Sequence, residues 1–190
     1  MAIIISNEKK AKELLPAGSY LARCYSIIDL GTQHNPAYNN DSRKIRITWE
    51  LPSEMRAFSE EKGEQPMVLG KKFTLSLNEK ATLRKFLAWW RGKDLSKEEC
   101  QNFDITKLLG EVCILAVGVD KYEDVEYNCI NSASPLMKGQ ECPAQINPSF
   151  ELSLYEWFSW EKFDALPQFT KDTIMKSVEF NDGVTLPSKL

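Results

Sequence analysis

Residues 43–51 hold the most regular pattern in the chain, an alternation of apolar and polar side chains. The apolar members are Ile45, Ile47, Trp49 and Leu51, and the polar members between them are Lys44, Arg46, Thr48 and Glu50. A period of two is typical of a β-strand that buries one face and exposes the other. Because a slip of one residue would exchange the two faces, this pattern predicts a sheet with a core on one side.

Other stretches predict further strands and one main helix. The strands are expected at 18–30, 68–77, 111–119 and 125–133, with a loop at 31–42 and a loop or hairpin tip at 52–67. Leu83, Phe86, Leu87 and Trp90 recur at helical spacing and predict a helix over 79–91, capped by Asn78 and ended by Gly92. One or two short helices are expected at 94–109, where Ser96 and Glu99 can form a capping box.

The order strand, strand, strand, helix, strand, strand is that of the OB-fold, a five-stranded Greek-key barrel. An SH3-like barrel has no helix at that position, and a ferredoxin-like sandwich needs a helix where 31–42 predicts a loop. We therefore expect a mainly β, OB-fold-like domain over residues 17–136, with a helix between strands 3 and 4. An N-terminal arm at 1–16 precedes it, and a C-terminal extension at 137–190 follows it. The expected core residues are Ile45, Ile47, Trp49, Phe73, Leu75, Leu83, Phe86 and Ile114.

The C-terminal extension combines acidic and aromatic residues. Its aromatic cluster consists of Tyr155, Trp157, Phe158, Trp160 and Phe163. Apolar surface is costly to leave in water, at about 25 cal/mol per Å². We expect residues 150–165 to fold back on the barrel, and the alternative is a segment that docks another copy or a partner protein.

Composition argues against several classes of protein. The 190 residues include 24 Lys and Arg against 27 Asp and Glu, a net charge of −3. No apolar run reaches the roughly 18 residues of a membrane span, so we expect no membrane contact and a cytoplasmic location. The five cysteines are odd in number with no C-x-x-C, and His34 is the only histidine. We therefore expect no disulfide framework, no metal site, no catalytic residues and no cofactor.

Charge is distributed unevenly, with +4 over residues 1–110 and −7 over residues 111–190. A basic first part is typical of a module that binds a polyanion. An OB-fold binds oligonucleotides or oligosaccharides across strands 2 and 3 and the neighbouring loops. The DNA-binding residues predicted on this basis are Arg43, Lys44, Arg46, Thr48, Lys71, Lys72 and Thr74 on the strands, and Tyr38 and Tyr122 in the loops. Cations neutralise phosphates and exposed aromatics stack on bases, although solvation of an outer sheet face needs such charges too.

Five stretches carry a further signal. They are LLPAGSYLARCYSIIDLGTQ (14–33), KIRITWELP (44–52), FTLSLNEKATLRKFLAWWRG (73–92), FDITKLLGEVCILAV (103–117) and SPLMKGQECPAQINPSFEL (134–152). These stretches resemble a family of small phage and prophage proteins labelled replication-initiation or single-stranded-DNA-binding-like. The resemblance covers most of residues 14–165 and implies binding of single-stranded DNA, with no catalytic residue. The chain ends in SKL and lacks the acidic tip of bacterial single-stranded-DNA-binding proteins, so docking of partners is expected at 150–165.

Three functions stay open at this point. The first is a phage-encoded, non-enzymatic single-stranded DNA-binding protein that acts in replication or recombination in the host cytoplasm. It would contact other replication or recombination proteins through 150–165, and a homodimer is compatible with it. The second is a protein-binding module, such as an inhibitor of a host defence system or nuclease, which the acidic second part suits. The third and weakest is a nuclease that holds a divalent metal with Glu54, Glu60, Glu61 and Glu64.

Overall fold

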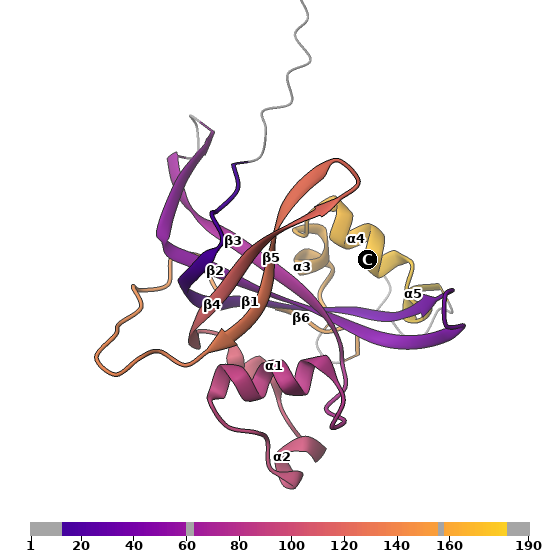
Figure 1. Ribbon diagram of the computed structural model, residues 1–190. Coiled ribbons are helices and arrows are strands. Elements are labelled where there is room, and N and C mark those ends of the chain that lie inside the picture. The colour runs from indigo at the N-terminus through magenta and orange to yellow at the C-terminus, as the bar shows by residue number, and fades with distance from the viewer. Residues whose placement is uncertain (1–12, 60–62, 156–157, 182–190) are drawn as a thin grey trace, which may run out of the picture.

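Five antiparallel strands form one curled sheet in the computed structural model, which describes residues 13–59, 63–155 and 158–181 (Figure 1). The strands are β1 (Gly18–Asn35), β2 (Asn40–Ser59), β3 (Gly63–Thr74), β4 (Val112–Tyr122) and β5 (Val125–Ser134). Their order in the sheet is β3-β2-β1-β4-β5, and a short strand β6 (Phe150–Leu152) pairs with β1 in parallel. The fold is therefore mainly β, as predicted.

The sheet curls until its two edge strands approach each other. Register shifts interrupt the pairing of β1 with β2 between Cys24 and Ser26 and between Asp29 and Gly31. Such bulges bend a strand and increase its twist. At the far edges, Lys71 Nζ of β3 donates a hydrogen bond of 2.5 Å to the carbonyl oxygen of Ile130 in β5. The result is a half-barrel with a concave and a convex side.

The main core fills the concave side. The ring of Trp49 is completely buried and lies 5.6 Å from the Phe86 ring and 5.5 Å from the Trp90 ring, measured between centroids. Both partners come from helix α1 (Thr82–Arg91), which packs against β5 and β3. The predicted core residues that are buried are Ile45, Ile47, Trp49, Phe73, Leu83 and Phe86. Leu75 and Ile114 are only half-buried, since Leu75 follows the end of β3 and Ile114 alternates with buried neighbours in β4.

The helices differ in placement from the single main helix that was expected. Helix α1 begins at Thr82 rather than at 79, and Ala81 rather than Asn78 occupies its N-cap position without a side-chain cap. Helix α2 (Lys97–Gln101) starts at the predicted capping box of Ser96 and Glu99. A 3₁₀ helix, η1 (Ile105–Leu108), precedes β4, and α3 (Trp160–Asp164), α4 (Gln168–Met175) and α5 (Val178–Asn181) follow β6.

The predicted loop at 31–42 is wrong, because most of this segment extends the β1–β2 hairpin, whereas 52–67 forms the end of the β2–β3 hairpin, one of the two alternatives predicted for it. Strand β1 runs on to Asn35 and β2 begins at Asn40, and the intervening turn contains Asn39 with a φ of 45°. Likewise β2 continues to Ser59 and β3 begins at Gly63. The ends of these hairpins extend beyond the core and are held together by backbone pairing. They therefore lack the regular apolar pattern by which a strand is recognised in a sequence. Glu60, Glu61 and most of the expected N-terminal arm lie outside the described residues.

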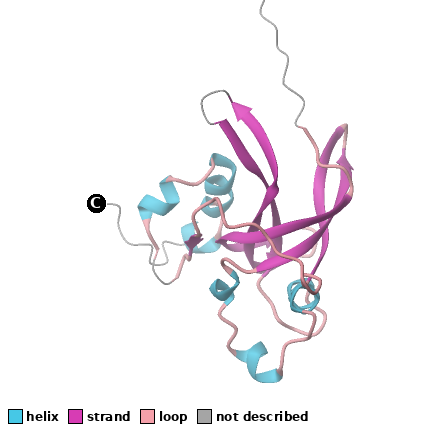
Figure 2. Cartoon of the chain, turned by 90° about the vertical axis from the view of Figure 1, so that its left-hand side faces the viewer, coloured by secondary structure: helices cyan, strands magenta, loops and turns pink. Residues whose placement is uncertain are grey.

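A second core lies on the convex side of β1. Ile28 and Leu30 of this strand pack there against residues of β6 and the last helices, namely Leu152, Leu154, Phe163, Leu166 and Ile174. Figure 2 shows α3, α4 and α5 grouped on one side of the sheet, apart from α1 and α2, which lie below it in this view. Strand β1 is thus buried on both faces, and the described part of 150–165 packs on it. Trp157 lies outside the described residues.

Candidate nucleic-acid interface

The convex face of β2 and β3 brings together several of the predicted DNA-binding side chains. The antiparallel register sets Lys44 opposite Thr74, and Arg46 opposite Lys72. Residues directly opposite each other project to the same face of a sheet. The alternation in the sequence therefore predicted this shared face correctly for these four residues, while their binding of DNA stays a prediction.

Arg46 and Lys72 are two like charges that lie opposite each other, with no counter-ion among the described residues. Among the residues that the structure describes, neither side chain has a carboxylate partner. Burial lowers the pKa of Arg46, an effect that Tyr25 partly offsets. Burial also lowers the pKa of Lys72, and the charge of Arg46 lowers it further. Like charges directly opposite each other destabilise a sheet, so this pair costs stability unless an anion joins it.

The guanidinium of Arg46 occupies a position that only a glycine leaves open. A β-carbon at Gly70 would lie 2.6 Å from Arg46 Nη2 and 2.8 Å from its Cζ. The same guanidinium lies over the ring of Phe169 in α4, with Arg46 Cζ 5.3 Å from the ring centroid. Arg46 is therefore held between the backbone of β3 and an aromatic ring, which orients its N–H groups.

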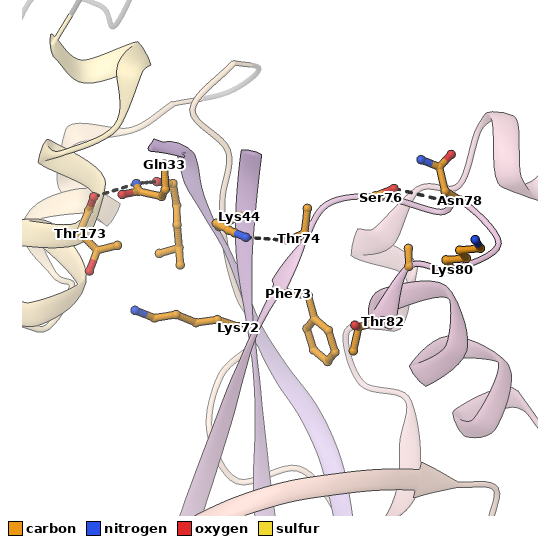
Figure 3. Close-up of a pocket in the computed structure, with 12 residues that line it drawn as sticks. Gln33, Lys44, Lys72, Phe73, Thr74, Ser76, Asn78, Lys80, Thr82 and Thr173 are labelled. Atoms are coloured by element: carbon orange, nitrogen blue, oxygen red, sulfur yellow. Dashed lines mark hydrogen bonds between the residues drawn. The ribbon is translucent and has the colours of Figure 1, made fainter. Parts of the chain in front are cut away.

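A groove of about 720 Å³ adjoins this pair, between α4 and the beginning of α1. The charged side chains that line it are Lys44, Lys72 and Lys80, and no carboxylate is among the lining residues of the described chain. In Figure 3, Lys72 extends toward the side of Gln33 and Thr173, while Lys44 Nζ donates to Thr74 Oγ1 at 2.6 Å. The groove combines positive charge with hydroxyl and amide groups, which suits a ligand that carries several anionic groups.

Three of the predicted strand residues, Thr48, Lys71 and Arg43, do not present free polar groups at this face. Thr48 is buried, with 7% of its surface exposed, and this corrects its assignment to a solvated surface. The next outward residue, Glu50, is also buried and accepts hydrogen bonds of 2.7 Å from the backbone N–H groups of Ile146 and Asn147. The chain that follows β5 thus covers this end of β2, which the alternation alone could not reveal.

Lys71 and Arg43 are directed elsewhere. Lys71 pairs with Ile47 and so belongs to the concave side, where it bridges β3 and β5. Arg43 Nη2 lies 2.5 Å from Asp29 Oδ2, and its Cζ is 4.2 Å from the centroid of the Tyr155 ring. Burial opposes the charge of Arg43, but Asp29 outweighs it and raises the pKa of Arg43. Both cations already have partners within the fold.

The two predicted stacking residues lie at hairpin tips rather than along the groove. Tyr38 is 78% exposed in the β1–β2 turn, and Tyr122 is 71% exposed at the tip of β4–β5. The sequence around Tyr122 is acidic, with carboxylates at Asp120, Glu123, Asp124 and Glu126, and Lys121 contacts Asp124 at 3.8 Å. Negative charge at this tip disfavours contact with phosphates.

Phe169 and Lys80 belong to this surface and were not predicted from the sequence. Phe169 comes from α4, more than 120 residues after Arg46, so only tertiary packing brings the two together. Gly70 was the available signal, because a glycine inside a strand often marks a close approach of another group. Lys80 lies in the turn before α1, a region that the sequence assigned to the helix itself.

Other kinds of site find little support in the described residues. No group of three or more His, Cys, Asp or Glu side chains gathers there as a metal site would need. No described helix is both long and apolar enough to cross a membrane. Burial raises the pKa of the Cys24 thiol to about 12, which disfavours the reactive thiolate form.

No model of a protein family matches the chain, and no curated protein matches it either.

Proposed function

We propose that this protein binds single-stranded DNA on the convex face of β2 and β3 and acts without catalysis in phage replication or recombination. The observation that carries the proposal is the pair Arg46 and Lys72, a half-buried and an exposed cation that lie opposite each other on β2 and β3, without a carboxylate partner among the described residues. A bound phosphate would remove their mutual repulsion and supply the missing counter-charge.

The extent of the positive surface favours a polymer over a small anion. Lys44, Lys72 and Lys80 line one groove, and Arg46 lies beside it. Several phosphates in a row can each displace counterions from such a surface, which strengthens binding at low salt. The α4 and α1 walls that border the groove favour a flexible single strand, which can bend between them, over a rigid duplex.

The arrangement of the strands supports the same proposal. The half-barrel order β3-β2-β1-β4-β5, with edges that meet at Lys71 and Ile130, is compatible with an OB-fold, whose ligands bind across strands 2 and 3. The resemblance of residues 14–165 to phage proteins labelled single-stranded-DNA-binding-like also agrees with it. The OB-fold assignment and the relation to these phage proteins are therefore part of what we propose.

A fluorescence-anisotropy titration with oligo-dT at several salt concentrations tests this function. The wild-type protein should bind with a steep salt dependence. The combined variant Lys44→Gln, Arg46→Gln, Lys72→Gln should reduce the slope of log K against log salt by about two, since each lost phosphate contact removes ~0.7 on single strands. Lys138→Gln, in the exposed stretch between β5 and β6, is the matched control and should leave the slope unchanged. A folded triple variant with wild-type affinity and slope would refute the proposal.

A protein-binding role is the second candidate, and the β4–β5 tip favours it. Four carboxylates, at Asp120, Glu123, Asp124 and Glu126, are close in sequence to the exposed Tyr122 and Tyr127 there. Segment 150–165 is the less suitable docking surface, because Leu152, Leu154 and Phe163 are already buried against β1. If oligo-dT fails to bind at low salt, a partner such as a host defence protein or nuclease becomes the leading candidate.

A further inference from the structure

We infer that Phe169 is the residue on which a base of the bound strand stacks, so that the site reads a phosphate and a base together. This inference rests on the function proposed above and names the ligand more narrowly: a polynucleotide with unpaired bases rather than any polyanion. It replaces the predicted stacking role of Tyr38 and Tyr122 with a residue beside the cations.

The position of Phe169 in α4 fixes its ring outside both cores. Thr170 and Ile174 of the same helix are buried, at 2% and 0% exposure, and turn one face of α4 into the second core. Phe169 and Thr173 lie one turn apart on another face, and Thr173 Oγ1 donates to the carbonyl oxygen of Phe169 at 2.8 Å. Thr173 lines the cationic groove. The ring therefore belongs to the groove side of the helix.

The helix that carries Phe169 is tied to the sheet. The side chain of Gln33 in β1 donates to the carbonyl oxygen of Thr173 at 3.0 Å, a contact drawn in Figure 3. Ile174 anchors the opposite face in the second core. Binding a base would therefore require little ordering of this wall, which lowers the entropic cost of association.

Phe169 remains 54% exposed although its ring touches Arg46. One face of the ring is directed at the guanidinium, and the exposed part of the ring is open to a planar ligand. Aromatic rings bind bases of any sequence by stacking, because every base offers a π-face. Arg46, fixed between this ring and Gly70, can at the same time donate its N–H groups to the phosphate next to that base.

The hairpin tyrosines are less suited to this role. Tyr38 and Tyr122 are carried by the turns at the ends of β1–β2 and β4–β5. Phe169 does not itself line the groove, but its ring centroid lies 5.3 Å from Arg46 Cζ, and Thr173, one turn further along α4, is a lining residue. A strand that follows Arg46, Lys72 and Lys44 therefore meets Phe169 first.

The test compares oligo-dT with an abasic oligomer of equal length, which has the same phosphates and no bases. The wild-type protein should bind oligo-dT at least about tenfold more tightly than the abasic oligomer. Phe169→Leu should abolish this difference by weakening oligo-dT binding alone, with an unchanged salt slope. Phe169→Trp should keep the difference, and Tyr122→Leu serves as the control that leaves both affinities as in the wild type.

The outcomes separate the two proposals. If the wild type binds neither oligomer, the proposed function fails. If it binds oligo-dT with a steep salt slope but Phe169→Leu changes nothing, the stacking role is refuted and the function stands. If Phe169→Leu weakens both oligomers equally, the ring only positions Arg46, and stacking is again refuted. Thermal melting of each variant checks the fold, and Phe169→Trp keeps the test valid if the leucine variant is damaged.

Discussion

Two groups of charges lie next to each other along β2, and they differ in whether the fold neutralises them. The first, which we call the anchor cluster, consists of Asp29, Arg43, Tyr155, Glu179 and Thr32. The second, the cationic face, consists of Lys44, Arg46 and Lys72. Although Arg43 and Lys44 are neighbours in sequence, Arg43 has an ion pair at 2.5 Å, whereas the partner of Lys44 among the described residues is a neutral hydroxyl.

In the anchor cluster, the two carboxylates have hydrogen-bond donors within the fold. Asp29 accepts hydrogen bonds from Arg43 and from the backbone N–H groups of Gly31 and Leu154. Glu179 accepts from Thr32 and from the Tyr155 hydroxyl. The contacts of Leu154 with Asp29 and of Glu179 with Thr32 fasten the C-terminal residues to β1. The cationic face lacks such partners in the described chain, so its charges have no comparable structural role.

Removing the centre of the anchor cluster should have the largest effect on stability. Asp29→Ala leaves Arg43 and two buried backbone donors without their acceptor, so we expect a loss of about 3 kcal/mol in the free energy of unfolding. Urea denaturation measures it. Asp94→Ala, which removes a surface ion pair with Arg84 and a hydrogen bond from the Leu95 N–H, is the control and should cause a much smaller loss. Equal losses in the two variants would show that Asp29 is not a structural anchor.

The anchor cluster should also give stability a dependence on pH. Burial opposes the ionisation of Glu179, but hydrogen bonds from Tyr155 and Thr32 outweigh it and lower the pKa of Glu179 from its ordinary value of 4.5. A lowered folded pKa means that this contribution is complete above pH 4.5 and is lost as the pH falls further, through the folded pKa.

Glu179→Gln should therefore melt below the wild type at pH 7, by about 2–4 °C per kcal/mol lost, and the gap should narrow toward pH 3. Melting curves of both proteins across this range measure the gap. Other carboxylates titrate in both proteins and cancel in the comparison. A gap that stays constant with pH would contradict the assigned role of the Glu179 carboxylate.

The contrast between the two groups also marks what the sequence could predict. Period-two alternation over 43–51 correctly placed Ile45, Ile47 and Trp49 in the core and set Arg46 on the opposite face. The same alternation failed for Thr48, because the segment at 146–147 covers that end of β2 through Glu50. A local pattern reports which way a side chain points and carries no information on what a distant segment places over it.

The roles of individual charges were less accessible for a related reason. Arg43 and Lys44 are both basic residues at the start of one strand, and only Asp29 and Tyr155, far away in sequence, distinguish them. Phe169 became part of the candidate site because α4 packs on β1, a contact that no spacing in the sequence encodes. Strand identity was therefore predictable, while the composition of the site depended on the C-terminal helices.

The cationic face should be unfavourable for the protein in the absence of a ligand. Lys72→Gln removes the repulsion with Arg46 and should raise the free energy of unfolding by about 0.5 kcal/mol, within the range of cross-strand charge pairs. The same variant should bind oligo-dT more weakly. Lys44→Gln is the control for stability, because Lys44 faces Thr74 rather than a cation. Urea denaturation that shows Lys72→Gln to be less stable than the wild type would contradict this account.

Gly70→Ala should produce the smallest of these effects, a loss of oligo-dT affinity that acts through Arg46 alone. The new methyl group would collide with the guanidinium of Arg46, which can move away because it ends a flexible side chain. The fold and the net charge should persist, but Arg46 would leave the ring of Phe169. Since an exposed cation–π contact contributes roughly 0.5–1 kcal/mol, we expect oligo-dT affinity to fall about two- to fivefold at an unchanged salt slope. Gly18→Ala, where a β-carbon meets only ordinary contacts from 3.5 Å, is the control. In the Arg46→Gln background Gly70→Ala should have no further effect, and an undiminished loss there would mean that Gly70 does not act through Arg46.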